Sequence, residues 1–503
     1  MSIVNHNLYN LLNPVQSPRK QTFLIKEDST SIDYSQIDSL SATIAHNLNR
    51  LGVQKGDRAI AVVNKSVEAL ALYLGCLRSG IVFVPLNPAF TPSELEYFFN
   101  DAKPKIVVSD RENLSQISSV ATQCSIELVK AIDSEDSNSL ITSQESFDYS
   151  DRKIAEVAKD DPAVMIYTSG TTGKPKGAIL SHHNLTVNGT DLKNYWGFTS
   201  ADTLLHSLPI FHVHGLFFAT HCVMLSGASM IFLPKFDAAK VIQHINQATV
   251  MMGVPTYYRR LLANSAFDKE SCEKMRLFIS GSAPLREDTF IEFEERTGLK
   301  ILERYGMSET GINTSNPLQG ERRLGTVGFS LGKSELRIVN ENNELLPPGE
   351  VGQVRVKGEN VFKGYWQMPE KTKAAFTEDG FFKTGDLGFV SSDNYLTLVG
   401  RAKDLIISGG MNVYPKEVEN RLNQISGVIE SAVIGLADSD FGEAVTAVLV
   451  IDETFQRDRD LKQILKKELV NYKIPKQFLF IDRLPKNAMG KVQKNKLREK
   501  YQS

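Results

Sequence analysis

The segment with the clearest chemical potential is a run of glycines, hydroxyl residues and lysines, Tyr167-Thr-Ser-Gly-Thr-Thr-Gly-Lys-Pro-Lys-Gly177, which follows the apolar stretch AVMIY. Glycines let the backbone approach an anion closely, hydroxyls donate hydrogen bonds, and lysines supply positive charge. A few glycine, serine and threonine residues alone would indicate only a flexible turn. The length of this run and its two lysines favour a phosphate-binding loop.

The loop does not match two common nucleotide-binding patterns. Counted from Gly170, the last glycine and the lysine of GxxxxGK[ST] fall on Pro175 and Lys176, and counted from Gly173 the pattern fails sooner. No GxGxxG follows a strand pattern, as a dinucleotide-binding fold would require. Simple P-loop kinase and dehydrogenase interpretations are therefore weak.

Alternating strand and helix signals surround the loop in the first half of the chain. Thr91-Pro92-Ser93-Glu94 has the form of a capping box with proline in the first turn, and it precedes the strand pattern KIVVS. Such alternation predicts an α/β fold with a mainly parallel sheet and helices on its faces. The other expected elements are a helix capped by Ser35 and running to Leu51, a strand at 58–63, a helix at 66–79 ended by Gly80, and a strand at 81–86.

The pattern changes near residue 350, where short strands without helices between them predict a small β-barrel-like subdomain. A smaller α+β pattern follows residues 400–404. Because 503 residues are too many for one core, we expect a large N-terminal domain, 1–403, and a small C-terminal domain, 404–503. The elements expected in the latter are helix 415–424, strands 428–436 and 444–451, helix 460–471 and strand 476–481.

Composition is that of an ordinary globular protein, with 42% apolar and 23% charged residues and a net charge of −2. This charge gives no reason to expect nucleic acid as a partner. Four widely spaced cysteines without a CxxC pair argue against a disulfide framework. With no signal peptide and no membrane-spanning stretch, we expect a cytoplasmic protein without a membrane partner. Residues 134–146 are the most linker-like.

YTSGTTGKPKG resembles the signature of the adenylate-forming superfamily, which includes acyl-CoA synthetases, firefly-luciferase-like enzymes and the adenylation domains of peptide synthetases. Further motifs along the chain agree with those of the superfamily in their order and spacing. Within the superfamily, FHVHGL, GVPTYYRRLL, ISGSAPL, ERYGMSETGINTSNPL and GERRLGTVG look most like the malonyl-CoA synthetases. The agreeing motifs are LPIFHVHG (208–215), ERYGMSET (303–310), TGD (384–386), GRAKDLIISGG (400–410), VYPKEVE (413–419) and PKNAMGK (485–491).

The resemblance implies an ATP-dependent acid–CoA ligase that forms malonyl-CoA, or methylmalonyl-CoA, through an acyl-adenylate and releases AMP and pyrophosphate. ATP, Mg²⁺ and CoA are the implied cofactors. Glu309, with Thr168, would hold Mg²⁺, and Ser308 stands where the family usually has a threonine. Asp386 would bind the ribose. The nucleotide-binding residues implied are Thr168, Ser169, Gly170, Thr171, Thr172, Gly173, Lys174, Pro175, Lys176, Ala283, Glu303, Arg304, Tyr305, Gly306, Met307, Asp386, Arg401 and Lys491.

The same resemblance gives the C-terminal domain its catalytic group. Lys491 matches the lysine that bridges the α-phosphate and the ribose during adenylation. Asp404 matches the hinge about which the small domain turns. Gly409 and Gly410 would line the path of the CoA thiol in the second arrangement. An exposed Lys491 would also be open to a protein lysine acetyltransferase, because acetylation removes its charge.

A malonate-type acid carries a second carboxylate, which must not be buried unpaired. Arg260 is the expected clamp, in the first turns of a helix capped by Thr256, where the helix dipole also favours an anion. Ser282 matches a serine of the malonyl-CoA synthetases. His212 and His214 stand at strand-like spacing. The resemblance implies that His212 is the pocket gate, and His214 could line the pocket. The remaining expected pocket residue is Met307, which would limit the substituent on the acid.

Three alternatives stay open. A ligase for a fatty or aromatic acid would need an apolar pocket, in which a cation is costly to bury. A nucleotide-binding regulator without catalysis is disfavoured by the joint presence of Glu309, Asp386, Arg401 and Lys491. A peptide-synthetase adenylation module usually needs an aspartate for the substrate amine and an adjoining carrier domain.

Overall fold

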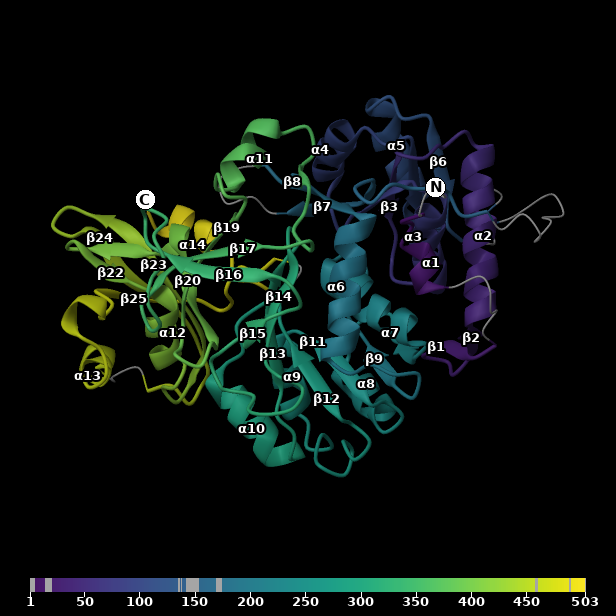
Figure 1. Ribbon diagram of the computed structural model, residues 1–503. Helices are drawn as coiled ribbons and strands as arrows, with labels where there is room; N and C mark the ends of the chain where they lie inside the picture. The colour runs from purple at the N-terminus through teal and green to yellow at the C-terminus, as the bar shows by residue number, and fades with distance from the viewer. Residues whose placement is uncertain are drawn as a thin grey trace.

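The computed structural model describes residues 5–13, 20–133, 136, 138–141, 153–168, 174–456, 460–487 and 490–502. The glycine-rich part of the predicted phosphate loop, residues 169–173, lies outside these ranges, as does most of the segment 134–146. A large body carries three sheets, and a smaller C-terminal body carries a fourth (Figure 1). This is the predicted mixed α/β architecture of a large and a small domain.

The first sheet contains the strands on either side of the phosphate loop. Its central strands are parallel, and β8 runs antiparallel to β7, so that the loop connects two adjacent strands. The order is β18 (Gly364–Tyr365), β8 (Lys176–Ser181), β7 (Pro162–Thr168), β4 (Val82–Pro85), β3 (Arg58–Val62), β5 (Ile106–Ser109) and β6 (Leu128–Ala131).

The second sheet carries the strand that leads into the ERYGMSET motif. Its central strands are parallel, and antiparallel strands close both edges. The order is β15 (Phe329–Ser330), β14 (Gly311–Ser315), β13 (Leu302–Met307), β12 (Leu277–Ser280), β11 (Val250–Gly253), β9 (Thr203–His206), β10 (Ser229–Phe232), β1 (Thr22–Lys26) and β2 (Ser31–Asp33).

Two smaller sheets follow. The β-rich subdomain predicted from the change of pattern near residue 350 is an antiparallel sheet. The C-terminal sheet has a long antiparallel pair at its centre, with one parallel strand beside it. The strands are β16 (Glu335–Val339), β17 (Gly352–Lys357), β19 (Phe382–Val390) and β20 (Leu396–Arg401) in the former, and β22 (Met411–Val413), β21 (Ile406–Ser408), β24 (Gly442–Ile451), β23 (Val428–Asp438) and β25 (Gln477–Phe480) in the latter.

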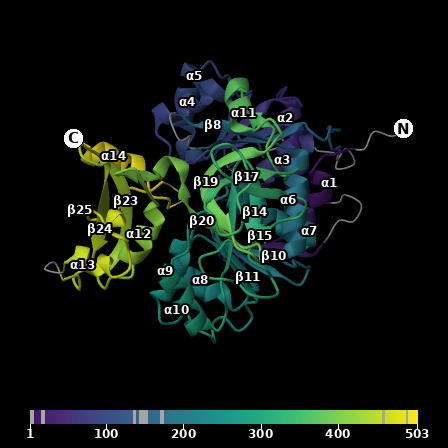
Figure 2. The ribbon, with the colours of Figure 1, turned by 60° about the vertical axis from the view of Figure 1, so that its left-hand side comes forward.

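Helices cover the sheets on both faces and pack around the C-terminal sheet (Figure 2). In the described residues they are α1 (Tyr9–Leu12), α2 (Tyr34–Arg50), α3 (Val67–Ser79), α4 (Pro92–Ala102), α5 (Leu114–Gln123), α6 (His182–Tyr195), a π-helix (His214–Ala219), α7 (Thr220–Ser226), α8 (Ala238–Ile245), α9 (Pro255–Leu262), α10 (Glu287–Thr297), α11 (Pro369–Ala375), α12 (Pro415–Leu422), α13 (Leu461–Lys466), α14 (Lys494–Tyr501), and 3₁₀ turns at Arg111–Asn113, Ala402–Asp404 and Asn471–Lys473.

Among the first helices of the chain, capping was predicted correctly for α3 and α4 and wrongly for α2. α3 begins after Ser66, whose side chain accepts from the Ala69 amide, and ends at the left-handed Gly80. α4 has the expected capping box. The N-cap of α2 is Asp33 rather than Ser35, because the Asp33 carboxylate accepts the Gln36 amide and places Ser35 inside the first turn.

The hydrophobic cores of the two bodies are separate. Every described cluster of buried apolar side chains lies either within residues 8–396 or within residues 406–497. β20 still pairs with β19 up to Arg401, and β21 already pairs with β24. The boundary between Lys403 and Asp404 stays a prediction, and this separation supports it.

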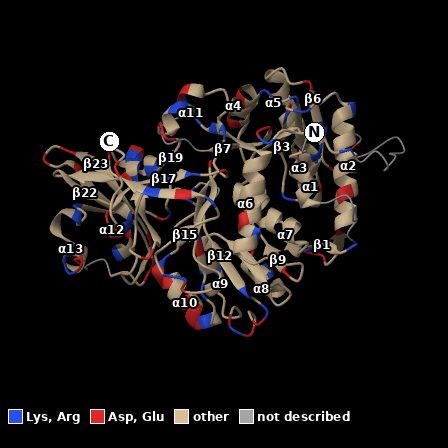
Figure 3. Cartoon of the chain, viewed as in Figure 1, with Lys and Arg blue, Asp and Glu red and all other residues tan. Residues whose placement is uncertain are grey.

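None of the described helices has the length and hydrophobicity that a membrane crossing requires. Lysine and arginine positions are interspersed with aspartate and glutamate positions along both bodies in the view of Figure 3, in keeping with a net charge near zero. A site for an anionic ligand must therefore be built locally.

Candidate active site

Charged residues from distant parts of the sequence meet between the two bodies. Lys491 of the C-terminal body interacts electrostatically with Arg304, Glu309, Asp386 and Arg401 of the N-terminal body. The sequence separates these residues by almost two hundred positions, so only the fold brings them together. This cluster is the candidate active site.

The described ends of the phosphate loop are held in place by aromatic side chains. Thr168 pairs with Lys176 across β7 and β8, so the loop leaves and re-enters adjacent strands. The Lys176 ammonium lies 4.0 Å from the centre of the Tyr365 ring, and that of Lys174 lies 5.2 Å from the Tyr97 ring. The Tyr97 hydroxyl donates to the Pro175 carbonyl at 2.6 Å. Both predicted lysines are therefore positioned at the loop.

Glu309 lies buried beside the loop. The Tyr365 hydroxyl donates to its Oε1 at 3.2 Å, and the Phe362 amide donates to its backbone carbonyl at 2.7 Å. Lys176 also interacts with the Glu309 carboxylate, which opposes the lowering of the lysine pKa by burial. No described group of three or more His, Cys, Asp or Glu residues could hold a metal by itself. A single carboxylate fits Mg²⁺ that completes its coordination with phosphate oxygens and water.

Asp386 is fixed from both sides of its carboxylate. It lies on β19 rather than in a turn, opposite Arg401 of β20. Arg401 Nε is 2.9 Å from Asp386 Oδ1, and the Tyr305 hydroxyl donates to Oδ2 at 2.5 Å. The Asp386 carboxylate raises the pKa of Arg401 above its ordinary value, so the arginine keeps its charge. Each carboxylate oxygen keeps a second lone pair, which can accept a hydrogen bond from a hydroxyl group.

The segment that follows Ala283, one of the expected nucleotide-binding residues, lies next to β13. The Leu285 amide donates to Glu303 Oε1 at 3.2 Å, which ties the turn after Ala283 to the strand. Burial raises the pKa of Glu303 to about 7, against the opposing effects of Lys416 and of the Leu285 amide. Ala283 is half-buried.

The histidines of LPIFHVHG do not lie on a strand, as their spacing had suggested. His212 lies in a turn and His214 opens the π-helix, a form often found at functional sites. The two still meet, because the His214 amide donates to His212 Nδ1 at 3.3 Å. His214 Nδ1 lies 3.4 Å from the hydroxyl of Ser282, a residue held in the left-handed backbone region.

Both histidines are neutral. Burial, with Lys491 and Arg304 nearby, lowers the pKa of His212 to about 3. Burial and the Arg304 cation place the pKa of His214 well below its ordinary value. A small cavity of about 10 Å³, room for roughly one water molecule, lies between this segment and Ser308.

Arg304, predicted only as a nucleotide-binding residue, has a setting that the sequence did not reveal. It is 3% exposed, and its Nε and Nη2 have no hydrogen-bond partner among the described residues. A Cβ added at Gly281 would lie 2.5 Å from its guanidinium carbon, and the Phe218 ring centre is 5.6 Å away. Burial lowers its pKa to about 9. The sequence signal for such a role is the presence of two charged residues, Glu303 and Arg304, in a strand whose first four residues are buried.

Arg260 does not have the predicted setting. α9 begins at Pro255, with Val254 as N-cap and no side-chain cap, so the predicted Thr256 cap is wrong. Pro255 takes the first helical position because it needs no amide partner there. Arg260 lies in the last turn of this short helix, exposed to solvent, while Arg259 is half-buried. The helix-dipole argument for Arg260 therefore does not hold.

Lys491 is set apart from the other lysines of its segment. Lys486 pairs with Glu430 at 2.6 Å and Lys494 with Glu419 at 2.6 Å. The Lys491 amide donates to Asn487 Oδ1 at 3.0 Å. The side chain keeps solvent access, yet desolvation by the protein around it and the Arg401 and Arg304 cations lower its pKa to about 8, against the effects of Asp386 and Glu309.

The remaining predicted residues lie on the C-terminal body. Asp404 ends the 3₁₀ turn after β20, and its Oδ1 is 2.8 Å from Arg498 Nη2. Gly409 and Gly410 form the exposed turn between β21 and β22, both in the left-handed region that favours glycine. Met307, at the end of β13, is half-buried.

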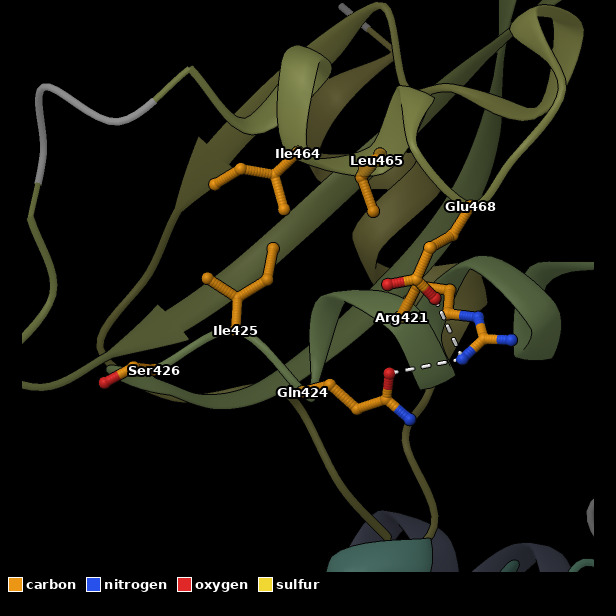
Figure 4. A pocket seen from close by; sticks show the side chains of 7 residues that line it. All are labelled: Arg421, Gln424, Ile425, Ser426, Ile464, Leu465 and Glu468. Carbon is orange, nitrogen blue, oxygen red and sulfur yellow. Dashed lines mark hydrogen bonds and ion pairs between the residues drawn. The ribbon is translucent and has the colours of Figure 1, made fainter.

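A pocket of about 200 Å³ lies outside this site, between α12 and α13 (Figure 4). Its arginine, Arg421, is already paired with Glu468 at 3.0 Å and donates to Gln424 at 3.3 Å. None of its lining residues belongs to the charged cluster around Lys491. The pocket therefore has no part in the candidate active site.

Comparison with known proteins agrees with this site. A family described as AMP-binding enzyme matches residues 13–366, and one described as AMP-binding enzyme C-terminal domain matches residues 417–491. The fold and site thus define an adenylate-forming enzyme. The chain belongs to the AMP-binding enzyme family, as an AMP-forming acyl-CoA synthetase.

Individual relatives differ in the acid that their names give. The chain is 34% identical to a malonate–CoA ligase of Arabidopsis thaliana over 95% of this chain and 86% of that protein. It is 32% identical to a feruloyl-CoA synthase of an Amycolatopsis species over 95% of each. ATP-bound MatB from Rhodopseudomonas palustris is 46% identical over 99% of each chain, with a TM-score of 0.95, and its apo form has a TM-score of 0.84. The arrangement seen here is thus closer to the ATP-bound form.

Proposed function

We propose that the chain converts malonate, ATP and CoA into malonyl-CoA, AMP and pyrophosphate through a malonyl-adenylate. The observation that carries the choice of acid is the buried Arg304 guanidinium, whose Nε and Nη2 have no hydrogen-bond partner among the described residues. It lies close enough to His212 and His214 to affect both, and His214 contacts Ser282. A buried cation without a partner is costly, and a ligand carboxylate would supply that partner. A planar guanidinium can bind a carboxylate through two hydrogen bonds.

In the first step, one malonate carboxylate oxygen attacks the α-phosphorus of ATP, and the bond from that phosphorus to the bridging oxygen of pyrophosphate breaks. Lys176 and the loop would orient the leaving phosphates, and Lys491 would stabilise charge on the α-phosphate. Asp386 and Arg401 would hold the ribose. Mg²⁺, when bound by Glu309 with Thr168, would supply neutralisation of the phosphate charge. His212 would close the pocket as a neutral donor or acceptor.

In the second step, the CoA thiolate attacks the acyl carbon and AMP leaves. We propose that the C-terminal domain turns about Asp404 between the two steps, so that Lys491 acts only in the first. Gly409 and Gly410 would then border the path of the thiol. Arg260, exposed on α9, remains a second candidate for contact with the acid at the mouth of its pocket.

A comparison of acids tests the choice of substrate. AMP release with ATP, Mg²⁺ and CoA should be fastest with malonate, slower with methylmalonate because Met307 limits the α-substituent, and weak with acetate, octanoate and 4-coumarate. If octanoate or coumarate exceeds malonate, the proposed acid pocket is wrong while the enzyme class stands. A lack of AMP with every acid would instead favour a nucleotide-binding regulator.

Lys491 is also a proposed target of a protein lysine acetyltransferase, since its side chain has solvent access and its pKa is lowered to about 8. Acetylation would remove the charge that adenylation needs. A sample fully acetylated at Lys491 should lose pyrophosphate exchange, and deacetylation should restore it. Unchanged pyrophosphate exchange in the acetylated sample would rule this regulation out.

The described cysteines are free, which supports the proposal of a reducing, cytoplasmic location.

A further inference from the structure

One arginine of the N-terminal body is bonded directly to the backbone of the C-terminal body. Arg286, the N-cap residue of α10, donates from Nη1 to the Ile429 carbonyl at 2.7 Å and from Nη2 to the Asn423 carbonyl at 2.8 Å. Asn423 is the C-cap of α12, and Ile429 lies in β23. A cation at a helix C-terminus is favoured by the helix dipole. One side chain therefore ties a helix end and a strand of the other body.

The Arg286 side chain is held in this orientation by its own body. Arg286 Nε donates to Asp288 Oδ1 at 3.1 Å, and its Nη2 also contacts Asp288 Oδ2. A second contact lies alongside, because Gln424 donates to Glu287 at 3.3 Å. Asp288 therefore holds the guanidinium in the orientation in which it meets the two carbonyls, and such restraint reduces the entropy that an arginine loses when it binds.

The elements that Arg286 contacts, α12 and β23, in turn contact the segment that carries Lys491. Glu430, next to Ile429 in β23, pairs with Lys486, and Lys486 forms a bridge with Val492 on the other side of the Lys491 turn. Glu419 of α12 pairs with Lys494 at 2.6 Å and accepts from the Val433 amide at 2.8 Å. The backbone of β23, the ion pair between Glu430 and Lys486, and the bridge to Val492 thus connect Arg286 to the Lys491 turn.

We propose that Arg286 is a positioning residue for the adenylation step, which docks the C-terminal domain so that Lys491 enters the site. This rests on the proposed function, in which Lys491 acts only in the first step. It follows that loss of Arg286 weakens adenylation selectively. A residue needed only for folding would weaken both steps alike.

The test compares the two half-reactions in Arg286→Ala. Pyrophosphate exchange with malonate should fall about tenfold, because two charge-assisted hydrogen bonds are lost. Malonyl-CoA formation from supplied malonyl-adenylate and CoA should change less than about twofold. Arg296→Ala is the matched control, since Arg296 lies on the same helix and bonds within its own body. It should leave the ratio of the two rates unchanged.

Amide hydrogen exchange separates this proposal from the proposed function. In Arg286→Ala without any acid, residues 423–430 and 486–487 should exchange faster than in the wild type, while α10 should not. The positioning role would be overturned by an equal fall in the rates of both half-reactions, or by a pattern of amide hydrogen exchange that matches that of the wild type. If the wild type shows no pyrophosphate exchange with any acid, the proposed function fails, and amide exchange still decides whether Arg286 docks the domain.

Discussion

Arg304→Met should reduce kcat/KM for malonate roughly 100-fold or more, since it removes a desolvated charge-assisted contact with the second carboxylate. Methionine keeps much of the length of the side chain and fills the space beside Gly281 and Phe218. Turnover of acetate, which has no second carboxylate, should change little, and a short apolar acid should gain. The measurement is AMP release for each acid across a range of concentrations.

Two controls keep this result interpretable. Arg304→Lys retains the charge without the planar fork, so we expect an intermediate loss. Arg260→Ala removes the exposed arginine and should cost severalfold at most, because exposed charges contribute little. The melting temperature of Arg304→Met without substrate should be unchanged or higher, since an unpaired buried cation is costly. A similar loss with malonate and acetate would place Arg304 outside the acid pocket.

The sequence predicted elements best where the determinants are local. Ser66, Gly80 and the Thr91 capping box each act within a few residues, and the structure confirms them. Asp33 and Ser35 both precede the apolar face of α2 and both can cap, so pattern alone could not decide between them. In LPIFHVHG, two histidines fit a strand spacing, but two positions are too few to exclude a π-helix.

The candidate site was predictable where a motif carries its members. Glu309, Asp386, Arg401 and Lys491 were named from their motifs, and the structure brings them together. The acid pocket was less predictable, because no local pattern tells which of several arginines points inward. Arg304 and Arg260 differ in burial only through the packing of β13 and α9 in the tertiary structure. Arg286 binds backbone carbonyls. Every residue has such a carbonyl, so the sequence does not indicate which residues Arg286 would contact.

Lys491→Ala should lower pyrophosphate exchange by about 10²- to 10³-fold, the usual effect of removing one preorganised charge from a transition state. Malonyl-CoA formation from supplied malonyl-adenylate should be nearly unchanged, because Lys491 has no part in the proposed thiol step. Lys486→Ala is the matched control, since Lys486 pairs with Glu430 and does not join the charged cluster. If both half-reactions fall together in Lys491→Ala, the lysine is not confined to adenylation.

The pH dependence gives an independent test of the same role. Desolvation and the neighbouring cations Arg401 and Arg304 lower the pKa of Lys491 to about 8, so the free enzyme loses this charge as the pH rises through that value. Because the cation is the active form, kcat/KM for ATP in pyrophosphate exchange should be flat below about 8 and fall about tenfold per pH unit above it. Lys491→Arg stays charged over this range. This variant should be slower than the wild type, and its rate should not fall above a pH of about 8. Persistence of the limb in Lys491→Arg would assign it to another group.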